Sequence, residues 1–570
     1  MEKVNKLKKI FKNEKIDGYY IPKNDEFFGE YTPNHNDRLK YITGFTGSYG
    51  FAIILRKKNY LFVDGRYTLQ AQKQSSKKFK IKSIPNELPR KILRKNLRIG
   101  YDPNLSTKNT IRILFGSKCK LIPINYNLVD KIWNRKNNHK IFKFYNLPRE
   151  STGKSYNQKI SQVSLNMKKH SADLFFVTAG ENIAWLLNIR GKDSAYAPIP
   201  NCYALIEKNK KIKLFCDLRK ISKSLRNNCK KVEFVKLESL AQILLNLNRK
   251  KIIIDKASCS IFFENIISKN NKILKYQDPI YKLKSIKSKI EIDNTIYSHI
   301  FDGAALTKFL FWLKKNFIKK KITEIKAEKK LLNFRKKYKT FKYSSFPTIS
   351  GTGPNGAIIH YRANKKSNLR LKKGDIYLVD SGGQYNFGTT DVTRTISLHN
   401  KSNRIKNIFT RVLKGHIAVA SYKLDKKTCG ANIDKEARKY LKQIDLDYAH
   451  GTGHGVGYFL NVHEGPQSIS KNDKTNFQSG MIVSNEPGYY EKDKFGIRIE
   501  NLIYVKKYKS KFVFDNLTMV PIDKDLIDQA ILNESEKSWI NKYHNKVFKN
   551  LRNFMDKVEL SELQKACSAI

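Results

Sequence analysis

The first half of the chain carries one succession of segments twice, and this repetition restricts the fold more than any other feature. Short apolar runs surround Asp17 and Asp64, and similar runs surround Asp173 and Asp217. The corresponding aspartates are 156 and 153 positions apart. Nearly equal spacing indicates one domain fold used twice. Because each copy alternates short apolar strands with amphipathic helices, the pattern predicts an α/β architecture.

The second copy ends near residue 284, and the pattern of apolar residues and glycines differs in the segment that follows. Residues 285–317 predict a long helix, because Ile292, Ile296 and Ile300 recur at four-residue spacing. Most of the glycines that separate strands lie further on, between residues 351 and 496. A length of 570 residues leaves room for several cores. We therefore expect two α/β domains, at residues 1–150 and 151–284, and a third domain of mixed α+β character at 285–570.

The charge balance raises the question of an acidic partner. Lys and Arg total 111 against 50 Asp and Glu, for a formal net charge of +61. Such an excess is typical of proteins that bind nucleic acid or anionic membranes. Here the basic residues form short runs throughout the chain, and 40% of all residues are hydrophobic. This composition excludes global disorder, and the even distribution indicates solvated faces, so we expect no specific nucleic-acid partner.

Cysteine usage and the amino-terminal segment bear on the compartment. The seven cysteines are far apart and form no pair with zinc-ligand spacing, which indicates free thiols in a reducing environment. The first residues mix charges with single apolar side chains, and no long apolar run occurs anywhere. Since a membrane span needs about 18 or more apolar residues, we expect a cytoplasmic protein with no membrane partner.

Five segments of the third domain place carboxylates or a histidine in loops or at strand ends. Each residue has an ordinary explanation when taken alone. An aspartate before glycines often forms a turn, an aspartate after threonine is usually a solvated strand residue, and a histidine between glycines can belong to a loop. A glutamate before proline is often exposed, and a glutamate near arginine often forms a structural ion pair. All five explanations would have to hold at once, in order along one domain. We therefore interpret the five as one site, made of Asp380, Asp391, His454, Glu486 and Glu500.

Strand alternation predicts how two of these segments are oriented. Ile497 and Ile499 would face the core, while Arg498 and Glu500 would share the opposite face. Asp380 follows an apolar run, so its carboxylate should be partly removed from water. The glycines on both sides of His454 allow a close approach of the backbone. These patterns favour a shared pocket rather than five separate surface positions.

Four neighbouring carboxylates need cations. Without them, mutual repulsion and burial would raise the carboxyl pKa values and destabilise the site. An oxygen-rich set with one imidazole suits two Mn²⁺ ions, with Co²⁺, Zn²⁺ or Fe²⁺ as alternatives. Two metals about 3.5 to 4 Å apart can hold a bridging hydroxide and polarise a carbonyl. The sequence therefore predicts a dinuclear site for amide hydrolysis.

At this point four strings carry a family resemblance: SFPTISGTGPNGAIIHY, TTDVTRT, HGTGHGVGYFLNVHEGP and NEPGYYEKDKFGIRIEN. They resemble the Xaa-Pro aminopeptidases of the long three-domain type, within the pita-bread metallopeptidases. The likeness extends over nearly the whole chain. It implies two creatinase-like α/β domains followed by a pita-bread catalytic domain with a C-terminal extension.

The resemblance also implies roles for individual residues. Asp380 would bind one metal, Asp391 and Glu500 would bridge both, and His454 and Glu486 would complete the other. Glu486 is also the expected proton shuttle. Residues outside the ligand set are expected to contact substrate or intermediate: His360, His450, His463 and Arg66, the last from the N-terminal domain. Arg498 would pair with a ligand carboxylate.

The function implied is removal of the N-terminal residue from peptides whose second residue is proline, by a cytosolic homodimer. A dipeptidase or a methionine-type aminopeptidase shares the ligand order and is the rival within enzymes. The two N-terminal domains and the strings around His360 and His463 favour the proline-directed enzyme. A non-catalytic binding module, such as a peptidase-like nucleic-acid chaperone, is the rival of another class. All five ligands are present, which argues against it.

Overall fold

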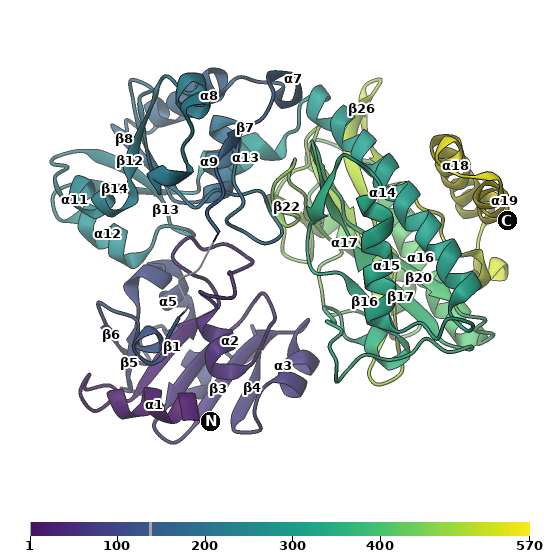
Figure 1. The fold of residues 1–570 in the computed structure, drawn as a ribbon, viewed down its shortest axis with the longest axis horizontal. Coiled ribbons are helices and arrows are strands. Elements are labelled where there is room, and N and C mark those ends of the chain that lie inside the picture. Colours follow the sequence, from purple (N-terminus) through teal and green to yellow (C-terminus); the bar gives the residue numbers. More distant parts are fainter. Residues whose placement is uncertain (1, 136–139) are drawn as a thin grey trace. The chain divides into compact units, whose positions relative to one another are not determined.

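The computed structural model describes residues 2–135 and 140–570. The chain forms two compact units, residues 1–280 and 281–570 (Figure 1). The first unit contains both copies of the repeat, and the second contains the segments with the clustered carboxylates.

The first sheet of unit 1 has six strands in the order β4-β3-β2-β1-β5-β6. At its centre, β1 runs antiparallel to β2 and parallel to β5. Buried residues such as Ile21, Ile54 and Leu61 pack a core against one face of the sheet. The strands are β1 (Gly18–Pro22), β2 (Phe51–Leu55), β3 (Asn59–Asp64), β4 (Phe79–Ile84), β5 (Arg98–Tyr101) and β6 (Lys120–Pro123).

The second sheet of unit 1 repeats this topology in the order β12-β11-β10-β8-β13-β14. Its central strand β8 is antiparallel to β10 and parallel to β13, as β1 is to its neighbours. The repeated α/β fold predicted from sequence is therefore confirmed. The strands are β8 (Leu174–Val177), β10 (Tyr203–Glu207), β11 (Ile212–Cys216), β12 (Val232–Lys236), β13 (Lys251–Asp255) and β14 (Lys272–Tyr276); β7 (Tyr145–Asn146) and β9 (Ile189–Arg190) form a separate pair.

Helices connect the strands of unit 1, and several begin at a polar cap. In the longest, the Ser155 side chain accepts from the backbone N–H of Gln158, which returns a side-chain contact to Ser155. The helices are α1 (Glu2–Ile10), α2 (Arg38–Thr43), α3 (Thr68–Gln74), α4 (Pro89–Ile92), α5 (Lys108–Phe115), α6 (Leu128–Ile132), α7 (Arg149–Thr152), α8 (Tyr156–Lys169), α9 (Gly180–Leu187), α10 (Lys223–Asn228), α11 (Leu240–Leu245) and α12 (Ile261–Ser268).

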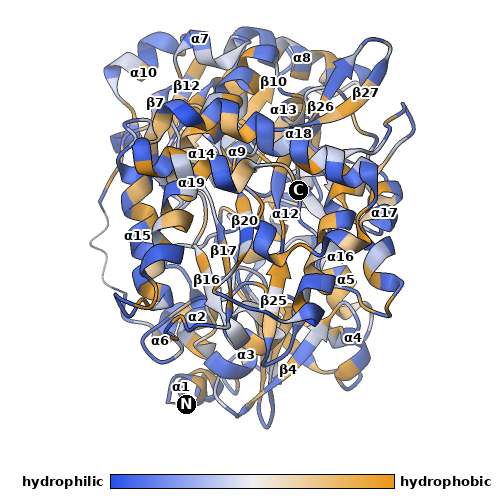
Figure 2. Cartoon of the chain, turned by 90° about the vertical axis from the view of Figure 1, so that its right-hand side faces the viewer, coloured by the Kyte–Doolittle hydropathy of each residue, from blue (hydrophilic) through white to orange (hydrophobic). Residues whose placement is uncertain are grey.

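The long helix predicted for residues 285–317 begins later in the structure. Ser285 ends a preceding helix, and Ser288 caps the long one, because Ser288 and Glu291 form a reciprocal capping box. In Figure 2, α15 and α16 carry both hydrophobic and hydrophilic residues, as expected for helices with one buried face. The helices are α13 (Pro279–Ser285), α14 (Lys289–Asn316), α15 (Glu324–Lys336), α16 (Asn403–Ala420), α17 (Gly430–Lys442), α18 (Glu534–Leu551) and α19 (Lys557–Cys567).

Unit 2 contains small antiparallel sheets that carry the candidate site. Strands β17 and β20 pair with Asp380 opposite Thr393. The sheet orders are β15-β18-β19, β16-β17-β20, β22-β21-β23-β26-β27 and β24-β25. Their bounds are β15 (Phe341–Ser344), β16 (Ile349–Thr352), β17 (Ile376–Ser381), β18 (Gly383–Tyr385), β19 (Gly388–Thr389), β20 (Val392–Ser397), β21 (Gly453–Gly455), β22 (Glu464–Ile469), β23 (Ile482–Asn485), β24 (Gly488–Glu491), β25 (Phe495–Arg498), β26 (Asn501–Tyr508) and β27 (Lys511–Asn516).

Two further observations concern the whole described chain. None of its helices combines the length and the apolar character that crossing a membrane requires. The seven cysteines are free thiols, and five of them are buried.

Candidate metal centre

The five candidate ligands lie in or beside five different strands of unit 2. Asp380 lies near the end of β17, and Asp391 directly precedes β20. His454 is the middle residue of β21, Glu486 directly follows β23, and Glu500 lies between β25 and β26. Antiparallel pairing of β17 with β20, and of β23 with both β21 and β26, brings these positions together.

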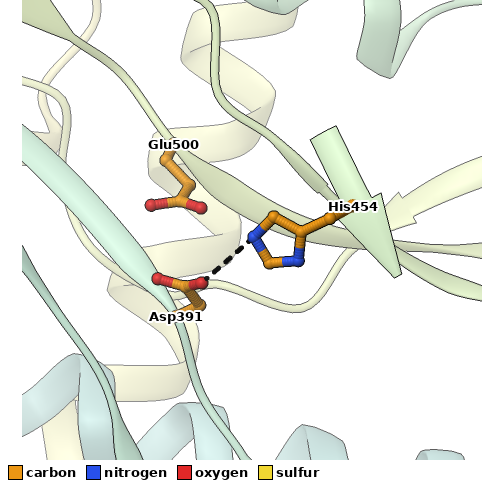
Figure 3. A group of neighbouring side chains, drawn as sticks. All are labelled: Asp391, His454 and Glu500. Carbon is orange, nitrogen blue, oxygen red and sulfur yellow. Dashed lines mark ion pairs between the residues drawn. The ribbon is translucent and has the colours of Figure 1, made fainter. Parts of the chain in front are cut away.

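Three of the candidate ligands form a tight group. Asp391, His454 and Glu500 each offer one ligand atom within 4.8 Å of the others. Figure 3 shows the imidazole of His454 directed toward the two carboxylates, with Nε2 3.5 Å from Asp391 Oδ2. The other ring nitrogen, Nδ1, lies 3.0 Å from the backbone carbonyl of Gly455. That contact fixes the ring so that Nε2 is presented to the carboxylates.

Glu486 adjoins this group on the side of His454. Its Oε1 lies 3.4 Å from His454 Nε2 and accepts a hydrogen bond of 2.9 Å from the Ser484 hydroxyl. The two strands can approach because residue 453 is glycine: a Cβ there would lie 1.9 Å from the Ser484 carbonyl oxygen. The close backbone approach predicted from the glycines around His454 is therefore present.

Asp380 is joined to the group through Arg498 and Thr393. Arg498 Nη2 donates to Asp380 Oδ2 over 2.6 Å, and Arg498 Nε donates to the Thr393 hydroxyl over 3.0 Å. That hydroxyl in turn donates to Glu500 Oε2 over 2.8 Å. Arg498 thus pairs with the carboxylate of a candidate ligand, Asp380, and one chain of hydrogen bonds orients two of the carboxylates.

Electrostatic repulsion among the buried carboxylates of this group favours a bound cation. Burial, followed by repulsion from Asp380 and Glu486, raises the pKa of Asp391 well above its ordinary value. Burial, followed by repulsion from Asp391 and Glu486, does the same to the pKa of Glu500. These carboxylates are costly to ionise together unless cations neutralise them.

The donor set fits divalent metals. Asp380 Oδ1 is buried and has no hydrogen-bond donor among the residues that the structure describes, whereas its other oxygen is held by Arg498. A buried carboxylate oxygen without a donor is available as a ligand. Four carboxylates and one imidazole supply the hard oxygen donors and the single nitrogen that suit Mn²⁺ or a similar ion.

The three predicted histidines occupy turns beside the strands of this group. His450 Nε2 lies 2.9 Å from the Tyr490 hydroxyl, and that hydroxyl accepts from Arg498 Nη1 over 2.6 Å. The ring of His463 packs at a centroid distance of 4.4 Å from the ring of His454. His360 is partly exposed in the turn that follows the short 3-10 helix Gly353–Ala357.

Arg66 belongs to the other unit. It lies in the turn after β3 and forms a forked ion pair with Asp64, at 2.7 Å between Nη2 and Oδ2. This is the local salt bridge that an Asp-Gly-Arg turn offers. Its contact with substrate stays a prediction.

Sequence reasoning did not identify Tyr490. Tyr490 connects Arg498 to His450 from the hairpin of β24 and β25, in which Tyr490 pairs with Gly496. Its only sequence signal is its place in the NEPGYYEKDK string, and the chain contains 30 tyrosines.

Four family models match successive parts of the chain. The model of the Creatinase/Prolidase N-terminal domain matches residues 3–131, and a second model of that description matches residues 134–291. The model of metallopeptidase family M24 matches residues 296–507, and that of the C-terminal region of peptidase M24 matches 511–570.

Whole proteins match over their full length. A probable Xaa-Pro aminopeptidase P of Laccaria bicolor is 38% identical, over 100% of this chain and 93% of the relative. Xaa-Pro aminopeptidase 1 of Dictyostelium discoideum is 36% identical, over 98% of this chain and 94% of the relative. The crystal structure of the X-prolyl aminopeptidase of Caenorhabditis elegans, a cytosolic enzyme with a di-nuclear active site, superposes with a TM-score of 0.94 at 30% identity, over 100% of this chain and 99% of that one.

The resemblance and the fold class predicted from sequence are thus confirmed: the chain belongs to the Xaa-Pro aminopeptidase family of M24 metallopeptidases, with creatinase-type N-terminal domains.

Proposed function

We propose that the protein removes the N-terminal residue from peptides that have proline in the second position. The observation that carries this proposal is the convergence of Asp391, His454 and Glu500 within 4.8 Å of one another, beside Asp380 and Glu486. It is supported by the relatives named Xaa-Pro aminopeptidase that match the chain from end to end.

We propose two divalent metals as cofactors, with Mn²⁺ preferred and Zn²⁺ or Co²⁺ as alternatives. Asp380, Asp391 and Glu500 would hold one ion, and Asp391, Glu500, His454 and Glu486 the other. When bound, the pair would polarise the scissile carbonyl and supply hydroxide at neutral pH. The oxygen-rich ligand set is the support for Mn²⁺.

The remaining chemistry belongs to side chains of this chain. Glu486 would carry a proton to the leaving proline nitrogen, because one of its oxygens is already oriented by the Ser484 hydroxyl. His463, packed against His454, would hydrogen-bond the carbonyl oxygen as negative charge develops on it. His450 would contact substrate from its place beside Tyr490, and His360 would border the proline ring.

Some parts of the proposal concern the whole chain. We propose domain limits at residues 1–150, 151–284 and 285–570, a cytoplasmic location and a homodimer. Arg66 would reach the substrate from the first of these domains. The cytosolic location of the Caenorhabditis elegans enzyme supports a cytoplasmic location here.

A peptide assay tests the activity. A short Xaa-Pro-Xaa peptide with a free amino terminus should release its first residue in the presence of Mn²⁺. The same peptide with alanine in the second position, or with an acetylated amino terminus, should remain intact. Release from dipeptides alone would favour the dipeptidase alternative, and release of N-terminal methionine without proline would favour a methionine-type enzyme.

A further inference from the structure

Glu324 is a buried carboxylate at the first turn of α15, outside the metal centre. Its side chain is fully buried, with 0% exposure. It forms no ion pair with any cationic side chain in the part of the chain that the structure describes, 2–135 and 140–570. A buried carboxylate without a cation is costly unless donors satisfy it.

Both oxygens of Glu324 are satisfied by one segment that follows in the sequence. Oε1 accepts from the backbone N–H of Thr352 over 2.9 Å. Oε2 accepts from the Tyr361 hydroxyl over 2.8 Å and from the backbone N–H of Leu369 over 2.9 Å. The side-chain amide of Asn355 lies 3.1 Å from each oxygen. One carboxylate therefore joins positions at the start, middle and end of residues 352–369.

The backbone of Glu324 strengthens the same connection. Its N–H donates to the carbonyl of Leu369 over 3.0 Å, and its carbonyl accepts from the Ser350 hydroxyl over 2.9 Å. Burial raises the pKa of Glu324, and the surrounding donors oppose that rise. At the N-terminus of α15, the helix dipole also favours a negative charge.

The segment that Glu324 holds leads to the metal centre. Tyr361, which donates to Glu324, directly follows His360 in the chain. The 3-10 helix at the start of the segment packs on β25, since a Cβ at Gly496 would lie 1.9 Å from the Gly356 carbonyl oxygen. Strand β25 carries Arg498, the residue that holds Asp380. The segment is thus fixed between α15 and the strand beside the ligands.

We infer that Glu324 is a positioning residue for His360: its buried carboxylate fixes residues 352–369 so that the imidazole is held in one place. The inference rests on the proposed function for the part played by His360. Loss of the carboxylate should leave the metals in place and should disorder the segment. Activity should fall because His360 no longer has a defined position.

A mutant cycle separates this role from general structural damage. Glu324→Ala should lower kcat/KM by about tenfold to a hundredfold, in the range expected for misplacing a catalytic group. In a His360→Ala background the same change should lower kcat/KM by less than about twofold, because residues that act through one another are not additive. Metal content should equal that of the wild type in all four proteins.

A readout that needs no activity accompanies the kinetics. Amide hydrogen exchange within residues 352–369 should become faster in Glu324→Ala, and to a smaller degree in Tyr361→Phe, which removes one of the donors. Glu291→Gln is the matched control, since Glu291 is also buried, caps the start of a helix and forms no ion pair with any described residue. It should change neither the exchange of this segment nor kcat/KM. If Glu324→Ala does not fold, Glu324→Gln and Tyr361→Phe provide the same two readouts.

Two results would contradict the inference about Glu324. Unchanged exchange in residues 352–369 would overturn the inference, and so would independent, multiplying losses for the Glu324 and His360 changes. A wild-type protein that does not cleave the proline peptide would contradict the proposed function, and the exchange experiment would then still decide whether Glu324 fixes the segment.

Discussion

The two oxygens of Asp380 have different surroundings, and Arg498 is the reason. Arg498 Nη2 donates to Oδ2 over 2.6 Å, while the buried Oδ1 has no donor among the described residues. The bound guanidinium orients the carboxylate, which leaves the second oxygen available to a metal ligated at this position. The arrangement depends on strand alternation, which directs Arg498 to the polar side of β25 while Ile497 enters the core.

Asp391→Asn tests the central carboxylate. We expect the variant to lose bound metal and activity together, because an amide is a poor bridging ligand. In the presence of chelator it should nevertheless be more stable than the metal-free wild type at pH 7. The reason is that the folded pKa of Asp391 is raised, so the metal-free protein loses stability as pH rises above the unfolded value of about 3.9.

Metal analysis and thermal unfolding check both parts of this prediction. The midpoint Tm of metal-free Asp391→Asn should exceed that of metal-free wild type by about 2 °C or more. A variant that keeps its metal, or one that is less stable than the wild type in chelator, would contradict the electrostatic account.

His463→Ala tests a residue beside the candidate ligands. The His463 ring packs against that of His454, but His463 is not part of the three-residue group of ligand atoms. We therefore expect metal content to be retained while kcat/KM falls by about 10². Kinetics and metal analysis on the same preparation make the comparison. Loss of metal would show that His463 is a ligand.

Some features of this site were accessible from sequence and others were not. Residues of one strand are related by alternation, so the shared face of Arg498 and Glu500 could be predicted from a short string. Arg394 could not be interpreted in the same way: it is buried, and it donates to the Glu500 carbonyl over 2.6 Å and to the Tyr543 hydroxyl over 2.8 Å. These partners lie 106 and 149 positions away. No local pattern marks such a contact.

The same distinction applies to the fold. The repeat in unit 1 could be recognised because two copies of one pattern reinforce each other, and their strand orders are identical. The start of α14 differs from the predicted position because hydrophobic spacing continues past the end of a helix. The capping contact of Ser288 with Glu291 defines where α14 begins. The role of Glu324 depends on a segment that ends 45 positions later, at Leu369. Only the folded chain shows that contact.

Acid sensitivity should depend on a buried histidine of α18. The His544 imidazole Nε2 accepts from the backbone N–H of Ile522 over 3.1 Å, so the ring is neutral in the folded state. Burial, followed by repulsion from Lys524 and Arg394, lowers the pKa of His544 to about 3. In the unfolded chain the imidazole has a pKa of about 6.5, so it binds a proton at pH values at which the folded chain leaves it neutral. Stability should therefore fall as pH decreases from about 6.5 toward 3.

Urea unfolding at two pH values measures this effect. The unfolding free energy should fall between pH 7 and pH 5 by about 2 kcal/mol on account of His544. His544→Gln retains an acceptor for the Ile522 N–H and should lose that part of the pH dependence. His399→Gln, at an exposed position, is the control and should behave as the wild type. An equal pH dependence in the His544 variant would be evidence against the assignment.

The net charge of +61 predicts how salt should act on two different kinds of binding. If the basic residues lie on solvated faces, any affinity for DNA or RNA should be insensitive to sequence and should weaken steeply between about 50 and 200 mM salt. Peptide cleavage should survive this range, because metal coordination and a buried site are poorly screened by mobile ions. Titrations with two unrelated oligonucleotides, run beside the peptide assay in Mn²⁺, compare the two. Sequence-selective binding at physiological salt, with no turnover of the proline peptide, would favour the binding-module alternative over the enzyme.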